Sequence, residues 1–222
     1  MIQINRFDRP TADGTFAASA GYLSVPTSLW PTSLWSVMAN RLSAATVIDL
    51  SQWRMAGNGG FRAVGEVIES HGGPGILWYP AVQYGDFVLR IEWRVSDAHD
   101  NSGVFLRIPV LTNSPQPAID DGYEVQIDER GVDPEHSRLD SPLHRSGAIY
   151  KLAPAVPGAS RPVGAWNAFE IIARGRSISV RLNDVPVSYL ENGYRRTVGH
   201  LGLQAHHAGS AVQFRGLDIQ EL

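Results

Sequence analysis

From about residue 46 onward, apolar and polar residues alternate in short runs. Within residues 86–95, one face carries only apolar side chains: Phe87, Leu89, Ile91, Trp93 and Val95. Residues 122–128 and 200–206 alternate in the same way. Because successive side chains of a strand point to opposite faces, each run predicts a strand with one face in the core.

Turn residues separate the runs. Residues 169–174 and 177–182 flank Gly175 and predict a hairpin, and Asn183-Asp184 predicts a tight turn into the next strand. Near the end of the chain, the buried parity changes around Arg215-Gly216, which indicates a β-bulge.

Many short strands without helices between them predict an all-β fold, a concanavalin-like jelly-roll sandwich of two antiparallel sheets. Only residues 34–45 have a helical period. The longest irregular segment, residues 129–146, exceeds a usual connection and is a candidate functional loop.

Residues 1–45 differ from the rest of the chain. They are rich in Ser, Thr, Ala and Pro, and the sequence PTSLW occurs twice in succession, ending at Trp30 and Trp35. We interpret them as an N-terminal extension whose two tryptophans pack on a jelly-roll domain of residues 46–222. The alternative is a segment that docks a partner or covers the substrate.

Composition removes several classes of function. The 222 residues carry 19 basic and 22 acidic side chains, a net charge of −3 that gives no field for a nucleic acid. No run of about 18 apolar residues predicts a membrane span. Residues 1–21 contain charges where a signal peptide needs an apolar region, so we expect a cytoplasmic protein. The absence of Cys excludes a thiolate nucleophile and Cys-ligated zinc.

Seven segments in order resemble the 3-keto-disaccharide hydrolase domain family. These segments are residues 84–94, 101–107, 122–128, 147–150, 166–167, 181–183 and 202–204, the last together with His206 and Phe214-Arg215. The resemblance covers about residues 47–222 and implies a concanavalin-like jelly roll that cleaves a glycoside carrying a ketone at C3.

Such a ketone acidifies the C2 proton, so cleavage needs a base, a group that holds the enolate oxygen, and an acid for the leaving group. An ordinary glycosidase instead needs two carboxyl groups about 5 to 9.5 Å apart. Glu124 and Asp128 share a strand face but lie about 13 Å apart, so they are no retaining pair. Either carboxylate could still pair with one from another strand, such as Glu92.

On this resemblance we expect His206 to be the base, Arg107 the partner of the enolate oxygen, and Glu124 the acid. The expected substrate-binding residues are Asn101, Gln126, Asp128, Arg94, Tyr150, Lys151, Gln204 and His144. For Glu124 and Gln126 the competing interpretation is cross-strand pairing with arginines on a solvated face. For Arg94 a salt bridge to Glu92 or Asp128 is the stronger interpretation.

We predict no metal or cofactor. The loop cluster of Asp133, Glu135, His136, Asp140 and His144 matches no specific metal site in its spacing, so a solvated polar loop is the favoured interpretation. The expected ligand is a carbohydrate or glycoside, and the sequence does not specify an oligomeric state.

The main alternative is a non-catalytic, lectin-like carbohydrate-binding module. It would stack sugars on aromatic platforms: Trp78, Tyr79, Tyr84 or Trp166. Convergence of a His and a carboxylate would distinguish catalysis from binding. A third possibility, an interaction domain that uses the Trp-rich N-terminal segment, predicts no sugar site.

Overall fold

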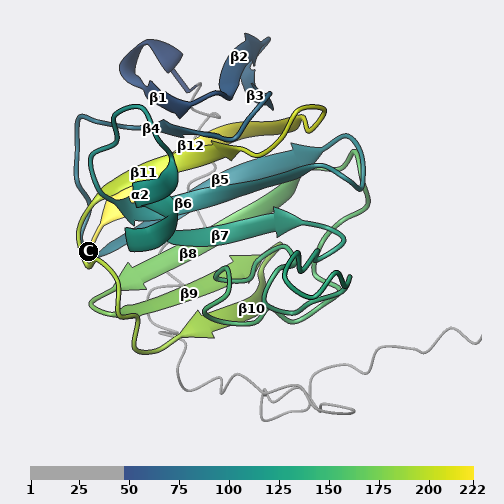
Figure 1. Cartoon of the computed structure of the whole chain (residues 1–222). Helices are drawn as coiled ribbons and strands as arrows, with labels where there is room; N and C mark the ends of the chain where they lie inside the picture. The colour runs from purple at the N-terminus through teal and green to yellow at the C-terminus, as the bar shows by residue number, and fades with distance from the viewer. Residues whose placement is uncertain (1–47) are drawn as a thin grey trace, which may run out of the picture. The chain divides into compact units, whose positions relative to one another are not determined.

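The computed structural model describes residues 48–222 (Figure 1). The expected N-terminal extension, with Trp30, Trp35 and the helical period of residues 34–45, lies outside the described residues.

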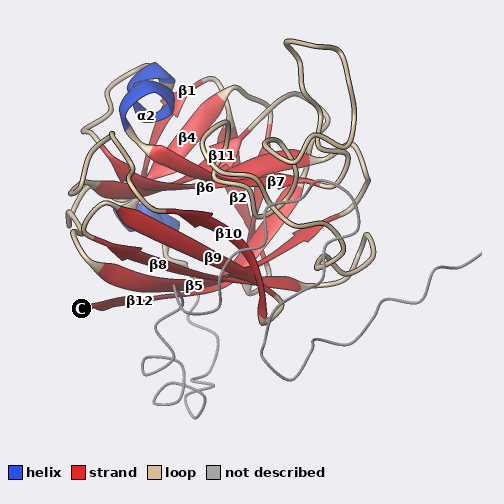
Figure 2. Cartoon of the chain, turned by 90° about the horizontal axis from the view of Figure 1, so that it is seen from below, coloured by secondary structure: helices blue, strands red, loops and turns tan. Residues whose placement is uncertain are grey.

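The described chain forms two antiparallel sheets that pack face to face (Figure 2). The smaller sheet has the strand order β1 (Arg54–Gly57), β4 (Gly75–Trp78), β11 (His200–Ala205), β6 (Asn101–Ile108) and β7 (Tyr123–Asp128). The larger sheet has the order β10 (Val185–Leu190), β9 (Ser177–Leu182), β8 (Asn167–Arg174), β5 (Phe87–Val95), β12 (Val212–Glu221), β3 (Val67–His71) and β2 (Gly60–Val64). The all-β jelly-roll prediction is confirmed.

The main core lies between the two sheets, where the apolar faces expected from the alternation are buried. On β5, Phe87, Leu89 and Trp93 have no exposed surface. On β7, Val125 and Ile127 face them from the other sheet and are equally buried. Burial of such large side chains is the main stabilising contribution to a fold of this kind.

The predicted turns and the bulge are confirmed. Asn183 and Asp184, between β9 and β10, both have positive φ angles, of 50° and 65°. This is the backbone of the two-residue hairpin turn whose twist matches that of its strands. In β12 the pairing with β5 shifts between Arg215 and Asp218, at the expected bulge.

A second apolar cluster lies on the outer face of the five-stranded sheet. There the short helix α2 (Gln116–Asp121) packs on β6 and β7. The cluster consists of Ala56, Ile76, Trp78, Phe105, Ile108, Leu111 and Ala118. The sequence pattern did not predict α2, which together with the 3-10 helix η2 (Leu50–Gln52) supplies the helical structure of the described chain.

Within residues 48–222, none of the helices has the length and hydropathy needed to cross a bilayer.

Candidate functional site

Polar side chains gather on the outer face of the five-stranded sheet, next to the apolar cluster under α2. They come from three neighbouring strands, because the core-facing residues of β7, β6 and β11 alternate with outward-facing ones. Asn101 pairs with Asp128, Gly103 with Gln126, and Phe105 with Glu124. We call the outward-facing group formed by Asn101, Glu124, Gln126, Asp128, Gln204 and the adjacent His206 the polar face.

Glu124 is the unusual member of the polar face. Its side chain lies beside Gly103 on β6, and the residue is only 7% exposed. Burial raises the pKa of its carboxyl to about 8, although the positive charge of Arg195 acts in the opposite direction. Glu124 is therefore largely protonated at neutral pH and can donate a proton.

Gln126 lies next to this carboxyl on the same strand. With its amide oriented so that the NH₂ group faces Glu124, the nitrogen donates to Glu124 Oε1 at 3.1 Å and to the Ser102 carbonyl at 3.2 Å. Gln204 follows Leu203, which pairs with Val104, so it lies across the sheet from Gly103. The buried Oε1 of Gln204 has no hydrogen-bond partner. The Gln126 amide thus contacts the Glu124 carboxyl, and Gln204 lies on the strand at the other side of Gly103.

Asp128 is buried and its oxygens are fully engaged. Oδ1 accepts from the backbone N–H groups of Arg130 and Gly131, at 2.9 and 3.1 Å. Oδ2 accepts from the backbone N–H of Val132 at 2.9 Å and from the Asn101 amide at 3.1 Å. Asp128 therefore fixes the start of the long connection that follows β7 and holds Asn101 in place.

His206 directly follows β11 and is exposed. Its Nδ1 is 2.8 Å from Nδ1 of His207. Partial desolvation and the neighbouring His207 lower its pKa, while the Asp128 carboxylate raises it. The net lowering leaves the ring neutral at pH 7, in the form that can accept a proton.

A segment of the long connection extends the sheet beside β7. The backbone N–H of Gln126 donates to the Ala148 carbonyl, and that of Tyr150 donates to the Glu124 carbonyl, both at 2.9 Å. This pairing places Tyr150 beside Glu124, and burial raises the pKa of the Tyr150 phenol. Residues 148–150 therefore border the polar face beside β7, and we call this segment the wall. Its position next to β7 results from the folding of the connection.

His144 packs against Tyr150 of the wall. Its ring meets the Tyr150 ring edge-on at 5.0 Å, and its Nδ1 lies 2.7 Å from Ser141 Oγ. The buried Nε2 has no partner, and burial lowers the pKa of the ring. Lys151 forms an ion pair with Glu135 at the outer edge, its Nζ 5.5 Å from the Tyr150 ring centroid.

Arg107 does not reach the polar face, which corrects the expectation that it is the partner of the enolate oxygen. Between the pairs His200–Ile108 and Gly202–Phe105, β6 has one residue more than β11. This extra residue forms a bulge at Arg107, whose φ is 53°, and the side chain turns into the protein with no exposed surface. There it donates to the carbonyl groups of Gly85 and Gly175.

Arg94 is also elsewhere, on the seven-stranded sheet. It follows the core residue Trp93 on β5, donates to Gln213, and lies 4.7 Å from the Trp166 ring centroid. Glu92, the suggested second carboxylate, lies on the same strand and accepts from Arg215 at 2.6 Å. Neither residue belongs to the sheet that carries Glu124.

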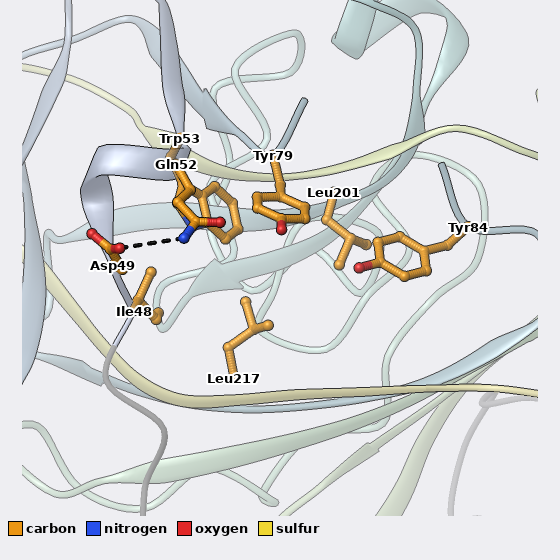
Figure 3. Close-up of a pocket in the computed structure, with 8 residues that line it drawn as sticks. All are labelled: Ile48, Asp49, Gln52, Trp53, Tyr79, Tyr84, Leu201 and Leu217. Carbon is orange, nitrogen blue, oxygen red and sulfur yellow. Dashed lines mark hydrogen bonds between the residues drawn. The ribbon is translucent and has the colours of Figure 1, made fainter. Parts of the chain in front are cut away.

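The suggested aromatic platforms are covered. Trp78 and Tyr84 are 3% and 8% exposed. The Trp166 ring has Arg215 at 4.0 Å in addition to Arg94. Tyr79 packs against Trp53 in a different pocket of about 250 Å³ (Figure 3). Leu201 also lines that pocket, on the core side of β11, so the pocket does not belong to the polar face.

Charged residues of the long connection, residues 129–146, form hydrogen bonds with each other. Asp133 accepts from His136 Nδ1 at 2.9 Å and from Arg138 Nε at 3.0 Å. In the part of the chain that the structure describes, no group of three or more His, Asp or Glu side chains is arranged to hold a metal ion.

Sequence reasoning missed the contributions of Arg195, Ser141 and Phe105. Arg195 acts on Glu124 from a loop seventy-one positions later in the chain, and its Nη1 donates to the Ile119 and Gly122 carbonyls. Nothing in the sequence indicates that proximity. For Phe105 the sequence does hold a signal: it is two residues from Gly103, which places both on the same face of β6.

Three comparisons place this fold among known proteins. The family described as 3-keto-alpha-glucoside-1,2-lyase-like domain matches residues 44–220. A protein from Bacteroides thetaiotaomicron named 3-keto-disaccharide hydrolase is 29% identical over an alignment of 156 residues that covers 65% of this chain. The match spans 50% of that relative's length.

Solved structures show the same architecture. A Parabacteroides distasonis protein described as a candidate glycosyl hydrolase has a TM-score of 0.66 at 19% identity, over 78% of this chain and 90% of the other. The carbohydrate-binding module CBM66 from Bacillus subtilis has a TM-score of 0.55 at 13% identity, over 77% of this chain and 96% of the other. At these identities the likeness concerns the fold alone.

Proposed function

Because this chain belongs to the family of 3-keto-α-glucoside-1,2-lyase-like domains, we propose that it cleaves a glycoside whose sugar carries a ketone at C3. The observation that carries the proposal is the buried, protonated carboxyl of Glu124 on an otherwise polar and hydrogen-bonding face. A neutral carboxylic acid at pH 7 is the group that a departing alkoxide needs.

The reaction proceeds in two halves. A base removes the C2 proton, the C2 electron pair forms the enolate of the C3 ketone, and its collapse expels the C1 oxygen. The leaving oxygen takes a proton from Glu124 and departs as an alcohol. Water then adds at C1 and a proton returns to C2, so the sum is hydrolysis of the glycosidic bond.

His206 is the proposed base. It is neutral at pH 7, and it lies at the same end of the polar face as Asp128 and Asn101. The developing imidazolium has the Asp128 carboxylate nearby, which favours the charged ring. Proton transfer to such a positioned group contributes about 10²- to 10⁴-fold in rate.

Neutral amides, in place of Arg107, are the proposed donors to the enolate oxygen. Gln126 lies beside the Glu124 carboxyl, and Gln204 lies opposite Gly103 on the neighbouring strand. The NH₂ group of Gln204 is the proposed donor to the keto oxygen, while its unpartnered Oε1 is an acceptor for a sugar hydroxyl. Tyr150, at the wall, supplies a phenol that burial keeps protonated. Hydrogen-bond donors fixed before the reaction stabilise a developing oxyanion.

The geometry disfavours a two-carboxylate glycosidase. Asp128, the second carboxylate on the face, accepts four hydrogen bonds from the protein and is committed to the loop. Glu92 lies on the other sheet. Neither Asp128 nor Glu92 can therefore serve as the second catalytic carboxylate that a glycosidase places opposite the first.

The test is cleavage of a 3-keto glucoside compared with its unoxidised parent, in D₂O, for the wild type and Glu124→Gln. We expect cleavage of the keto substrate alone, deuterium at C2 of the rehydrated product, and a large loss of rate in Glu124→Gln. Cleavage of the parent with retention of the C2 hydrogen would overturn the elimination. Binding of sugar without any turnover would instead support the lectin-like alternative.

A further inference from the structure

We propose that Gly103 is a positioning residue for this reaction: the space left by its missing side chain holds the Glu124 carboxyl across β6, among the amides of the polar face. This inference rests on the proposed role of Glu124 as the acid. It assigns to a residue without a side chain the task of placing that acid.

The evidence is the contact that a Cβ at position 103 would make. Such an atom would lie 2.7 Å from Cγ and 2.8 Å from Cδ of Glu124, and closer still to Oε1. Real Cβ atoms essentially never approach heavy atoms within 3.0 Å. The three nearest atoms all belong to Glu124, so the space above Gly103 is occupied by this one side chain.

The pairing register explains why this space matters. Glu124 pairs with Phe105, which belongs to the apolar cluster under α2, whereas Gly103 pairs with Gln126. By extending over Gly103, the Glu124 side chain leaves the apolar part of the face and brings its carboxyl to the amide of Gln126. A side chain at position 103 would close that path.

Backbone conformation does not require glycine here. Gly103 lies within β6, and its φ is not among the positive values that favour glycine. Glycine in a strand interior weakens the strand, so a packing or functional reason is expected where it occurs. The close approach of the Glu124 carboxyl supplies this reason.

The first experiment titrates the Glu124 carboxyl directly. Protein with ¹³C-labelled Glu side chains is followed by NMR across pH, and Glu124→Gln assigns the resonance. In Gly103→Ala we expect the pKa of Glu124 to fall from about 8 toward the ordinary 4.5, because the carboxyl is displaced into solvent. The alkaline limit of cleavage should move to lower pH by the same amount.

Gly85→Ala is the matched control. A Cβ there would meet only Val198 Cγ2 at an ordinary 3.6 Å, and Gly85 lies outside the polar face. We expect this variant to keep both the Glu124 titration and the pH profile. A folded Gly103→Ala protein with an unchanged Glu124 titration would overturn the inference.

A double-mutant cycle covers the case in which Gly103→Ala is poorly folded. If the added methyl group collides with Glu124, Gly103→Ala should lower the melting temperature in the wild-type background and have a much smaller effect in Glu124→Ala. Equal losses in both backgrounds would contradict the inference. Neither the titration nor the cycle needs a substrate, so failure of the proposed function would be recognised separately.

Discussion

Arg107 and Gly85 are joined by two hydrogen bonds, from Nε at 2.9 Å and from Nη2 at 2.6 Å to the Gly85 carbonyl oxygen. Nη1 donates to the Gly175 carbonyl at 2.7 Å. The fully buried guanidinium thereby connects the bulge of β6 to the segment that precedes β5 and to the turn between β8 and β9. A residue expected to touch substrate is thus a link between the two sheets.

Replacing Arg107 should therefore destabilise the protein without abolishing its chemistry. Arg107→Met removes the fully buried guanidinium that donates to the Gly85 and Gly175 carbonyl groups, which should cost on the order of 3 kcal/mol in the free energy of unfolding. Denaturant unfolding and kcat of the remaining folded protein separate the two effects. Arg94→Met, on the outer face of the other sheet, is the control and should lose far less stability. A large fall in kcat at full stability would restore the catalytic interpretation of Arg107.

The raised pKa of Glu124 predicts how stability depends on pH. The folded protein holds this proton up to about pH 8, whereas the unfolded chain releases it near 4.5. The stabilisation is complete below pH 4.5 and is lost as the pH rises through about 8, a difference on the order of 5 kcal/mol. Urea unfolding at a series of pH values should show this fall in the wild type. Glu124→Gln should lack it, and a similar slope in both proteins would contradict the buried neutral carboxyl.

Loss of the Asp128 carboxylate should loosen the start of the long connection. Asp128→Ala leaves three backbone N–H groups without their acceptor, so we expect a loss of about 2 kcal/mol and faster amide exchange after β7. Hydrogen exchange of residues 129–146 measures the effect. Gln126→Ala is the comparison, because it changes the same face but leaves these loop contacts in place. If exchange were unchanged in Asp128→Ala, the loop would depend on other contacts.

Acid should open the wall formed by Tyr150. Burial lowers the pKa of His144 below the 6.5 of an exposed ring, so the unfolded chain takes up a proton before the folded one. Stability contributed by the neutral ring is present above pH 6.5 and is lost as the pH falls through the folded value. Limited proteolysis between residues 141 and 151 should therefore increase at mildly acidic pH. His144→Phe, which keeps a ring against Tyr150 but cannot be protonated, should remove this dependence.

Alternation predicted which side chains of β7 and β11 share a face, whereas their grouping into one substrate-binding face was expected from the family resemblance. On β7 the pattern continues without interruption, so Glu124, Gln126 and Asp128 lie together as expected. The parity of Gln204 on β11 was likewise predicted, whereas Asn101 on β6 was expected from the resemblance. The pairing of β6 with β7 and with β11 brings both residues near β7. A side chain's parity is a property of local sequence, and it was predictable wherever the strand stayed regular.

Local sequence could not predict the position of a side chain where that position depends on another strand. The bulge at Arg107 exists because β6 has one residue more than β11 over the same stretch, and no property of β6 alone reveals that difference. The expectation that Arg94 binds substrate beside Glu124 was wrong for another reason. Parity indicates the face of a strand on which a side chain lies, but not the sheet to which the strand belongs. Arg195 reaches Glu124 only through the folded loop, so its influence had no local signal.

The positions of the last two strands also bear on how this domain forms during synthesis. β11 lies between β4 and β6, and β12 lies between β5 and β3, so each fills an interior place in its sheet. While residues 200–221 have not yet emerged from the ribosome, the nascent chain exposes two incomplete sheets with unpaired inner edges. The core can close only after translation of these residues, and until then the nascent chain depends on protection from aggregation.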